Sequence, residues 1–569
     1  MPHHAPTIRS RMRDARKLRA SRCGPSELYR KETRALWLKR RPWKGRIMLN
    51  DAVKGFLYRI LRTPSREAVF DRATGKRYAY FELGCRGARL AKYLTDDLGL
   101  QQGEVIALSA ENNIAFIDAF YASLMTGVII TTYNGRLRAD DLAPLIARER
   151  PRVVFVSEGH RQKIEESCRL ADASCVLVSL DGEDGSLPCY SDIMAGEIGA
   201  CSLPSLDGFA DFDIEETQLL VHTGGTTGLP KSAKISFRAV LYNALSEILT
   251  VGLTQRDCGI TFLPFFHTVG WNVTTLPSLL VGARIVLTDS LDPGVLLELI
   301  ASERPTTGLA LEAVFRRMAE HPAFASTDFS SYRLLANGAG PISTSTMELY
   351  WRRGVKLINA YGMTETGPNN CFYPDSDESL ESIMQHSDTV GKPMCFTELK
   401  IVDEEGREVP TGTDGELLWR GPVTFSGYWN DRASTAGIMA EGGWVRSGDI
   451  GHLDRMGYVH LQGRLKNMIV TNGENVFPIE IENTLKDCPG VEECCVIGVP
   501  DAERGEVAKA LVHMEEGAAF DRDALERFVR GKLSSIKVPH YFVEVDDFFK
   551  RGLKVDLGAI KERYGHAGE

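Results

Sequence analysis

The chain has 569 residues and a mass of 63.0 kDa, several times the usual length of one domain, so a single small binding module is excluded. Hydrophobic residues make up 43% and charged residues 25%, as in globular proteins, which excludes global disorder. The net charge is -9 at pH 7 but is unevenly spread, because residues 1–47 contain fifteen Lys or Arg and only three acidic residues.

No part of the sequence has the apolar length of a membrane-spanning helix. The longest candidate, residues 115–130, is shorter than the roughly 18 to 20 residues required and contains Asp118. The N-terminus has no apolar signal core, and the twelve cysteines include no C-x-x-C pair. These features predict a reducing, cytoplasmic location and no cysteine-bound metal.

The basic head, residues 1–47, differs in character from the acidic remainder of the chain. Such an arm can contact nucleic acid, a membrane or an acidic partner, and an organellar transit peptide is a weaker alternative. Charge runs are usually solvated, so we favour a partly disordered tail that lies on the acidic body. We find no clear nucleic-acid or membrane signal outside this arm.

From about residue 47 the sequence alternates short β-branched runs with longer helical patterns. A strand is predicted over residues 105–110, a helix over 114–124 and a strand over 153–156. Further strands, over residues 218–222, 284–288, 333–336 and 356–360, each end in a loop of small residues. The alternation predicts an α/β fold of parallel sheets covered by helices, with ligands at these loops.

Near residue 398 the sequence pattern changes to one that is typical of an antiparallel subdomain. Strands are predicted over residues 399–402, 416–419 and 458–461, with Gly and Pro between them. After residue 463 a smaller α+β unit follows, with helices predicted over 478–486 and 521–533 and strands over 491–498, 508–513 and 541–545. We therefore predict a basic extension (1–47), a large N-terminal domain that includes the β-rich subdomain (48–464) and a small C-terminal domain (465–569).

A glycine- and threonine-rich loop follows the strand predicted over residues 218–222 and precedes a helical pattern. It reads His222-Thr223-Gly224-Gly225-Thr226-Thr227-Gly228-Leu229-Pro230-Lys231-Ser232. Glycines let backbone N–H groups approach an anion, threonines add hydroxyl donors and the lysine adds positive charge, so the loop suits a triphosphate. It is not a Walker loop, because Pro230 stands where that motif needs glycine.

This loop resembles the signature of the adenylate-forming superfamily, which comprises acyl-CoA synthetases, luciferases and peptide-synthetase adenylation domains. The resemblance continues in order along roughly residues 50 to 569, with acyl-CoA synthetases the most similar group. The chain departs from the signature at Gly225 and Ser232, and the first change removes a serine hydroxyl that would contact phosphate. The resemblance implies that ATP is bound by Thr223, Gly224, Gly225, Thr226, Thr227, Gly228 and Lys231.

Two further motifs border the reacting groups in the family. The run 263–267 ends in His267 and resembles the aromatic-histidine motif of the acyl pocket, which implies that His267, Trp271 and Asn272 border the substrate. A histidine beside two phenylalanines is otherwise usually a core residue. The loop Gly338-Ala339-Gly340 resembles the segment against which the family packs adenine, although by itself it could be any turn.

The run 359–366, which contains Tyr-Gly-Met-Thr-Glu, is the second strong match. The resemblance implies that Asn359 and Tyr361 contact the nucleotide, with Tyr361 stacked on adenine. Thr364 would donate a hydroxyl to the α-phosphate, and Glu365 would supply a hard oxygen ligand for Mg²⁺. The alternative interpretation, that this run is only the polar end of a strand, would not explain why its residues match the family motif in order.

The later motifs concern the ribose and the movement of the C-terminal domain. The resemblance implies that Asp449 accepts hydrogen bonds from the ribose hydroxyls and that Arg464 reaches ribose or phosphate. Lys466 would be the pivot of a mobile C-terminal domain. The run from Gly473 to Glu482 is similar to one in CoA ligases that faces the active site during thioester formation.

The resemblance is weakest near the C-terminus. The family's catalytic lysine normally lies in P-x-T-x-x-G-K, whereas this chain has no proline, threonine or adjoining glycine at the matching place. Lys554 is the preferred candidate, Lys550 or Arg551 could serve instead, and a third alternative is that none of them enters the site.

Together the motifs imply an ATP-dependent enzyme that adenylates a carboxylic acid and transfers the acyl group to CoA. His267, Thr364, Glu365 and Lys554 would be the catalytic residues. A carrier protein or a partner enzyme could receive the acyl group instead of CoA, and a non-catalytic nucleotide-binding protein is the alternative from another class. The acid is open, and so is a homodimer.

Overall fold

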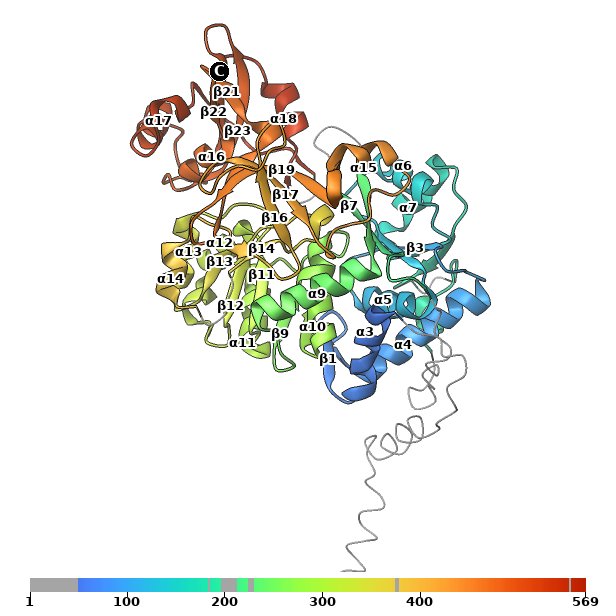
Figure 1. Cartoon of the computed structure of the whole chain (residues 1–569). Helices are drawn as coiled ribbons and strands as arrows, with labels where there is room; N and C mark the ends of the chain where they lie inside the picture. The colour runs from blue at the N-terminus through green and yellow to red at the C-terminus, as the bar shows by residue number, and fades with distance from the viewer. Residues whose placement is uncertain are drawn as a thin grey trace, which may run out of the picture.

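The computed structural model of the protein describes residues 50–182, 185–195, 212–223, 230–373, 378–551 and 554–568. A large N-terminal body carries a smaller C-terminal domain, drawn in orange and red in Figure 1. In the described part of the chain no helix is both long and apolar enough to cross a bilayer.

Two mixed sheets form the large body. The first has the order β6-β5-β3-β4-β7-β8, with bounds β3 (Val105–Ser109), β4 (Ile129–Thr132), β5 (Val153–Val156), β6 (Val176–Ser179), β7 (Thr217–Thr223) and β8 (Lys231–Ser236). The second has the order β13-β12-β11-β9-β10-β1-β2, with bounds β1 (Glu67–Asp71), β2 (Lys76–Ala79), β9 (Cys258–Thr261), β10 (Arg284–Leu287), β11 (Thr307–Ala310), β12 (Leu334–Asn337) and β13 (Leu357–Asn359).

Helices cover both faces of these sheets because alternate strand residues are apolar on each side. In β3, Ile106 and Leu108 join the main core while Ala107 packs in a separate cluster on the opposite face. The main core also contains Ile285 and Leu287 of β10, so it lies between the two sheets. The helices of the large body are α3 (Asp51–Arg62), α4 (Tyr80–Lys92), α5 (Ile114–Thr126), α6 (Ala139–Glu149), α7 (Glu158–Leu170), α8 (Tyr190–Ile193), α9 (Phe237–Val251), α10 (Leu276–Val281), α11 (Pro293–Glu303), α12 (Glu312–Glu320), α13 (Thr344–Trp351), α14 (Leu380–Gln385) and α15 (Arg432–Ile438).

Helix α5 is the apolar run that contains Asp118, and every one of its residues is buried. The Asp118 carboxylate accepts hydrogen bonds from Arg86 at 2.6 and 2.9 Å and from the Tyr190 hydroxyl at 2.8 Å. These partners explain how a carboxylate occurs inside a core helix.

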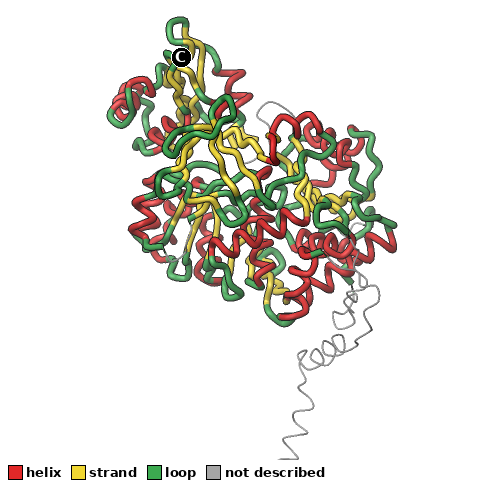
Figure 2. The backbone as a smooth tube through the Cα atoms, viewed as in Figure 1, coloured by secondary structure: helices red, strands yellow, loops and turns green. Residues whose placement is uncertain are grey.

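A β-rich subdomain lies between the large body and the C-terminal domain, and its strands appear yellow in Figure 2. Its strands are β16 (Glu398–Val402), β17 (Gly415–Arg420), β18 (Met439–Ala440), β19 (Trp444–Leu453) and β20 (Val459–Arg464), all paired antiparallel. A two-stranded sheet of β14 (Cys371–Phe372) and β15 (Lys392–Pro393) precedes it.

The C-terminal domain is a mixed sheet with helices on both faces. Its strands are β21 (Ile469–Thr471), β22 (Glu474–Val476), β23 (Val491–Asp501), β24 (Gly505–Met514) and β25 (Tyr541–Glu544), followed by the short pair β26 (Lys550–Arg551) and β27 (Lys554–Val555). Helices α16 (Pro478–Lys486) and α17 (Arg522–Arg530) share one core cluster with Cys494 and Val496, whereas α18 (Leu557–Tyr564) packs with Cys495 and Ile497. The alternation of β23 thus supplies both faces, and the predicted α/β class with a small α+β domain is confirmed.

The structure corrects two predictions made from local pattern. The phosphate loop is followed first by β8, antiparallel to β7, and only then by helix α9; β2 is likewise antiparallel to β1, so the sheets are mixed rather than purely parallel. The run Lys231–Ser236 has weak strand propensity, but its backbone pairs with β7. Residues 444–453 form the ten-residue strand β19, which was not among the strands predicted for the antiparallel subdomain.

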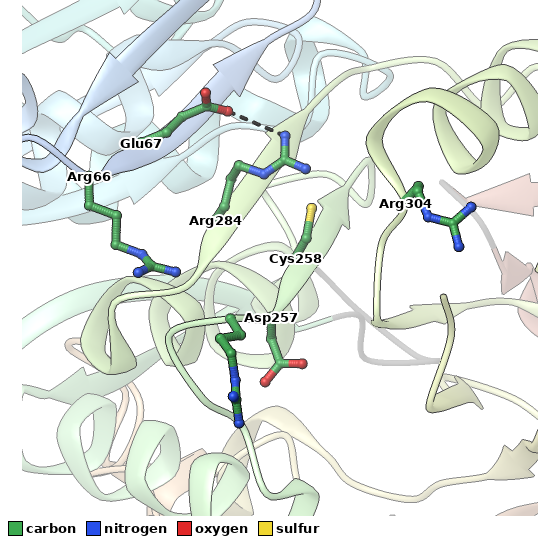
Figure 3. Close-up of a pocket in the computed structure, with 7 residues that line it drawn as sticks. Arg66, Glu67, Asp257, Cys258, Arg284 and Arg304 are labelled. Atoms are coloured by element: carbon green, nitrogen blue, oxygen red, sulfur yellow. Dashed lines mark hydrogen bonds and ion pairs between the residues drawn. The ribbon is translucent and has the colours of Figure 1, made fainter. Parts of the chain in front are cut away.

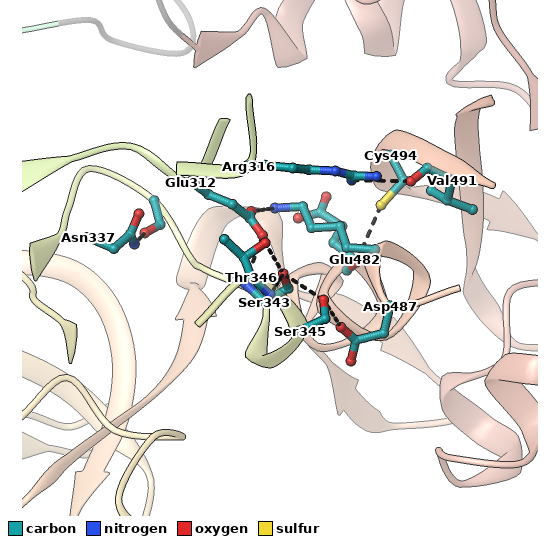
Figure 4. Close-up of polar contacts among 12 residues, drawn as sticks. Glu312, Arg316, Asn337, Ser343, Ser345, Thr346, Glu482, Asp487, Val491 and Cys494 are labelled. Carbon is teal, nitrogen blue, oxygen red and sulfur yellow. Dashed lines mark hydrogen bonds and ion pairs between the residues drawn. The ribbon is translucent and has the colours of Figure 1, made fainter. Parts of the chain in front are cut away.

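Polar contacts join the C-terminal domain to α12 and α13 (Figure 4). Lys486 donates to the Glu312 carboxylate at 2.8 Å, and the Ser345 hydroxyl donates to Asp487 at 3.0 Å. Burial opposes ionisation of Glu312, but the charge and hydrogen bond of Lys486 outweigh it and hold the Glu312 pKa below its ordinary value. Arg316 of α12 also contacts Glu515 and the carbonyl of Val491, so several polar contacts, with the Lys486–Glu312 pair among them, join the C-terminal domain to the large body.

Candidate active site

The predicted nucleotide residues lie at the carboxyl ends of strands in the two large sheets. Thr223 ends β7, Asn359 ends β13, and Gly338 follows the last residue of β12. Parallel strands place such ends at one edge of a sheet, so Gly338 and Asn359 lie close together although they are distant in sequence, whereas Thr223 belongs to the other large sheet. Residues 224–228, which contain most of the predicted phosphate loop, lie outside the described residues.

Asn337 ties the predicted adenine loop to the end of β13. Its side-chain amide donates to the carbonyl of Gly340 at 2.7 Å and to Oδ1 of Asn359 at 3.0 Å. Ala339 has a φ of 64°, a left-handed conformation that an alanine rarely adopts. The loop therefore projects an exposed residue pair, Ala339 and Gly340, beyond a buried anchor.

Tyr361, Asp449 and Arg464 form one hydrogen-bonded group. The Tyr361 hydroxyl donates to Oδ2 of Asp449 at 2.6 Å, and Arg464 Nε lies 2.7 Å from Oδ1. Asp449 and Arg464 are paired across β19 and β20, which explains why residues fifteen positions apart meet. Both oxygens of a nearly buried carboxylate thus have partners, and the guanidinium remains partly exposed.

A second group surrounds Glu365, which is 7% exposed at the start of a 3-10 helix, Thr364–Thr366. The Tyr428 hydroxyl donates to Oε1 of Glu365 at 2.6 Å, and the ammonium of Lys231 lies 5.1 Å from the centre of the Tyr428 ring. Burial, followed by the charge of Glu365, raises the pKa of Tyr428. Tyr428 therefore stays a neutral donor that holds Glu365 beside the predicted phosphate-binding lysine.

Glu365 also tests the predicted magnesium site. Among the described residues, no group of three or more His, Cys, Asp or Glu side chains could hold a metal ion. Mg²⁺ in nucleotide sites is usually bound by one or two carboxylates together with substrate phosphates and water. A single carboxylate beside a phosphate loop fits that arrangement, and a cage made of protein ligands alone is not needed.

The carboxylate of Glu149, 3% exposed at the end of α6, links both strands that flank the phosphate loop. It lies 2.7 Å from Nε2 of His222 in β7 and accepts from the Ser232 hydroxyl in β8 at 2.5 Å. Thr131 donates to its other oxygen at 2.9 Å. Burial alone would raise the Glu149 pKa, but His222 and these hydrogen bonds outweigh it and lower the pKa.

The aromatic-histidine run adjoins the core. Trp271 is 1% exposed and packs against Phe265 and Phe116, with ring centres 4.5 and 6.2 Å away. The carbonyl of Asn272 accepts from Asn243 and Asn369 at 2.6 and 3.1 Å. His267, the last residue of the run 263–267, is only half-buried, whereas Trp271 packs in the hydrophobic core.

The predicted hinge residue and the predicted C-terminal motifs lie in different elements of secondary structure. Lys466 lies in a 3-10 helix, Leu465–Asn467, between β20 and β21. Gly473 is at the tip of the β21–β22 hairpin, where Asn472 and Gly473 both have positive φ, as a two-residue type I′ turn requires. The backbone of Lys554 pairs with that of Arg551 in β27 and β26, and the side chains of both lie outside the described residues.

Comparison with known proteins identifies the chain. The model of the AMP-binding enzyme family matches residues 56–429, and the model of the AMP-binding enzyme C-terminal domain matches residues 480–552. The chain belongs to the family of AMP-binding enzymes.

Relatives of this AMP-binding enzyme are similar over most of their length. It is 31% identical to a feruloyl-CoA synthase of Amycolatopsis sp, over 88% of this chain and 97% of the relative. It is also 31% identical to an indoleacetate–CoA ligase of Aromatoleum aromaticum, over 84% and 91%. The crystal structure of ATP-bound MatB from Rhodopseudomonas palustris matches with a TM-score of 0.80 at 28% identity, covering 90% of this chain and 99% of that one. The predicted membership of the adenylate-forming superfamily, close to acyl-CoA synthetases, is confirmed.

The motifs of this AMP-binding enzyme did not reveal Glu149 and Tyr428. Both act through contacts with residues that are distant in sequence: Glu149 precedes Ser232 by 83 positions, and Tyr428 follows Glu365 by 63. The signal in the sequence was weak. Glu149 lies in a charged run, Arg148 to Arg150, that looks like a solvated surface, and Tyr428 lies in no motif that we recognised.

A cavity of about 270 Å³ lies away from these groups (Figure 3). Its lining includes Asp257, Cys258 and Arg284, which stand at the amino ends of β9 and β10. That is the edge of the sheet opposite to Gly338 and Asn359. The lining of this cavity contains four arginines and two carboxylates, of which Arg284 and Glu67 are paired at 3.3 Å, and it contains none of the predicted nucleotide residues.

Proposed function

We propose that this AMP-binding enzyme activates a carboxylic acid with ATP to an acyl-adenylate and then transfers the acyl group to CoA. The observation that carries this proposal is the similarity to CoA ligases over more than four-fifths of the chain. The family and its relatives confirm the predicted activity of an AMP-forming acid–CoA ligase. The roles of individual residues are our proposal and rest on the geometry described above.

In the first half-reaction, an oxygen of the substrate carboxylate attacks the α-phosphorus of ATP. A carboxylate–phosphorus bond forms, the bond to the bridging oxygen breaks and pyrophosphate leaves. Thr364 and His267 face the reacting groups, while the phosphate loop from Thr223 to Lys231 offsets the charge on the leaving group. Mg²⁺, bound by Glu365 and the phosphates, would supply further charge neutralisation, and Tyr428 orients that carboxylate.

The nucleoside part of ATP would be bound by the group around Asp449. Its carboxylate exchanges the bonds to Tyr361 and Arg464 for bonds to the ribose hydroxyls, so that Tyr361 is released to stack on adenine. The exposed pair Ala339 and Gly340 lets the flat base approach the backbone.

In the second half-reaction, the C-terminal domain reorients about Lys466 and the thiol of CoA attacks the acyl carbon. The thiol gives up its proton to water, a carbon–sulfur bond forms, and AMP leaves with the electron pair of the broken acyl–oxygen bond. Gly473, at an exposed hairpin tip, is suited to move towards the site, and Lys554 would act only in the first half-reaction. The boundaries 48–464 and 465–569 are part of this proposal.

Several finer expectations remain predictions. The acyl acceptor could be a carrier protein or a partner enzyme instead of CoA, in which case this enzyme would catalyse adenylation alone. The homodimer also stays a prediction. The cytoplasmic location rests on cysteine usage, and ten cysteines in the described part of the chain form no disulfide. The basic head, residues 1–47, lies outside the described residues.

The test separates the two half-reactions. Pyrophosphate release from ATP is measured with the full chain across a panel of acids, with Mg²⁺ and with EDTA in excess. We expect pyrophosphate release that depends on the acid and stops when EDTA is in excess. Absence of pyrophosphate release with every acid would refute the proposed enzymatic activity. Preformed acyl-adenylate is then mixed with CoA; absence of thioester by mass spectrometry would overturn CoA as acceptor and leave adenylation standing.

A further inference from the structure

Two cysteines of the large body place their thiols in direct contact. Sγ of Cys168, in the last turn of α7, lies 3.3 Å from Sγ of Cys175, which immediately precedes β6. Cys168 is 8% exposed and Cys175 is half-buried, so a small molecule from the solvent can reach the pair. The proposed reaction uses neither thiol.

The end of helix α7 explains why cysteines seven positions apart meet. The N–H of Ala173 donates to the carbonyl of Cys168 at 3.0 Å, and the N–H of Asp172 donates to the carbonyl of Arg169 at 3.3 Å. Asp172 has a φ of 47°, so the helix ends in a Schellman motif. This turn reverses the chain, and Cys175 then packs against the apolar cluster that contains Cys168. The contact between the thiols is therefore set by the backbone of the turn.

The two thiols are arranged for oxidation to a disulfide. A hydrogen bond from the Cys175 thiol stabilises the thiolate of Cys168 and lowers the pKa of Cys168. The thiolate is the form of cysteine that reacts with oxidants. Sulfur atoms in a disulfide are about 2.05 Å apart, so the two atoms need to approach by only about 1.2 Å.

The same apolar cluster leads to the phosphate loop. Tyr133 belongs to the cluster of Cys168 and is 1% exposed. Its ring is stacked on that of His222, with ring centres 5.7 Å apart and planes 5° apart. His222 directly precedes the phosphate loop and lies 2.7 Å from Glu149. Because protein interiors are close-packed, movement of the sulfur atoms would displace Tyr133 and with it His222.

We propose that Cys168 and Cys175 form a redox-sensitive modification site, and that their oxidation to a disulfide by a peroxide weakens the binding of ATP. The effect on ATP rests on the proposed function, whereas formation of the disulfide does not. In the reducing location that the cysteine usage predicts, the pair stays reduced until a peroxide is present.

The oxidation has two steps. The thiolate of Cys168 attacks an oxygen of hydrogen peroxide, the O–O bond breaks, a sulfenic acid forms, and the hydroxide that leaves takes up a proton to become water. The sulfur of Cys175 then attacks the sulfur of Cys168. The S–S bond forms, the S–O bond breaks, and hydroxide leaves with the thiol proton as a second water. The two thiols lose two electrons, which the peroxide gains, and a thiol reductant reverses the change.

Peptide mapping by mass spectrometry identifies the site. The folded full chain is treated with increasing hydrogen peroxide, the remaining thiols are blocked with N-ethylmaleimide, and peptides are separated without reduction. We expect a disulfide between Cys168 and Cys175 at peroxide concentrations that leave Cys189 reduced. Cys189 is the matched control, because it is also half-buried but its thiol lies 3.0 Å from the hydroxyl of Ser191 instead of another thiol.

Calorimetric titration with ATP measures the consequence. Kd for ATP should be at least threefold higher in the oxidised parent than in the reduced parent, and dithiothreitol should restore it. Peroxide should leave Kd unchanged in Cys175→Ser, whereas Cys189→Ser should respond as the parent does. Thermal unfolding shows whether each variant is folded, and Cys175→Ala is the second variant in case the serine hydroxyl disturbs the apolar cluster.

Four results would overturn the inference. Cys168 and Cys175 that stay reduced while Cys189 reacts would show that the pair is not the modification site. A disulfide that leaves Kd for ATP unchanged would contradict the coupling through Tyr133. Equal loss of ATP affinity in peroxide-treated Cys175→Ser would assign the effect to another residue. A reduced parent that binds no ATP would refute the proposed function, and with it the effect on ATP, even where the disulfide is found.

Discussion

The charge of Glu149 can be removed without changing the shape of its side chain. Glu149→Gln keeps one oxygen for the bonds from His222 and Ser232 but makes them neutral, and its amide group must donate to Thr131. We expect the variant to fold and to be less stable than the parent, because three short bonds to a buried carboxylate tie α6 to His222 of β7, Ser232 of β8 and Thr131 of β4.

The size of the effect follows from these three bonds. A hydrogen bond to a charged group contributes about 1.5 to 3 kcal/mol, and a neutral one about 0.5 to 1.5 kcal/mol. Loss of charge therefore costs about 1 kcal/mol per bond, or about 3 kcal/mol in all. With an unfolding entropy of about 2.1 cal/mol/K per residue over roughly 400 residues, this lowers Tm by about 3 to 4 °C.

Differential scanning calorimetry at pH 7.5 measures this change. The matched control is Glu165→Gln, which neutralises a carboxylate that is 45% exposed and paired with Arg161; its effect should stay below about 0.5 kcal/mol. Because Glu149 has a lowered pKa, its stabilisation is complete above the ordinary Glu value of about 4.3 and is lost as the pH falls through the folded-state value. The Tm difference between parent and variant should therefore narrow below about pH 4.

The same variant reports on the phosphate loop. If Glu149 sets the spacing of the strands beside the loop, Glu149→Gln should also raise KM for ATP at 25 °C, where both proteins are folded. An unchanged Tm at pH 7.5, or a variant more stable than the parent, would refute the assigned role of the carboxylate.

Three further substitutions test other parts of the structure. Lys486→Met leaves Glu312 buried without its cation, so the distribution of distances between fluorescent labels on the two domains should broaden; an unchanged distribution would show that the pair does not fix the orientation. Asp449→Asn should raise KM for ATP by about tenfold or more, because the proposed charged acceptor for ribose would be lost; an unaltered KM would contradict a role of Asp449 in nucleotide binding. Lys554→Ala should slow pyrophosphate release much more than thioester formation from preformed adenylate, and equal rates in parent and variant would transfer the role to Lys550 or elsewhere.

The fold was predictable where a segment's own pattern determines its structure. The strand over residues 153–156 and the helix over 478–486 begin and end in the structure where the sequence predicted. The strand Lys231–Ser236 was missed because its stability comes from pairing with β7, which propensity does not record. The β21–β22 hairpin was missed although Asn472-Gly473 is a strong two-residue turn signal.

The sequence proposes the candidate site as motifs, but it does not contain the contacts between them. Tyr361 and Asp449 were each found from their neighbours in sequence, but the hydrogen bond that joins them spans 88 positions. Their mutual contact depends on how the β-rich subdomain lies on the large sheet, and no local pattern contains that information. Buried partners such as Tyr428 are missed for the same reason.

The carboxylates inside this enzyme differ in whether hydrogen-bond donors or cations surround them. Asp118 and Glu149 each accept three hydrogen bonds, and the partly buried Glu312, whose side chain is 14% exposed, is paired with Lys486 of the C-terminal domain, so contacts within the fold explain their burial. Glu247 is as deeply buried, yet burial is what determines its pKa, and one of its oxygens contacts no donor. A hydrophobic residue there would make the fold more stable, because it would remove an unpaired polar group from the interior.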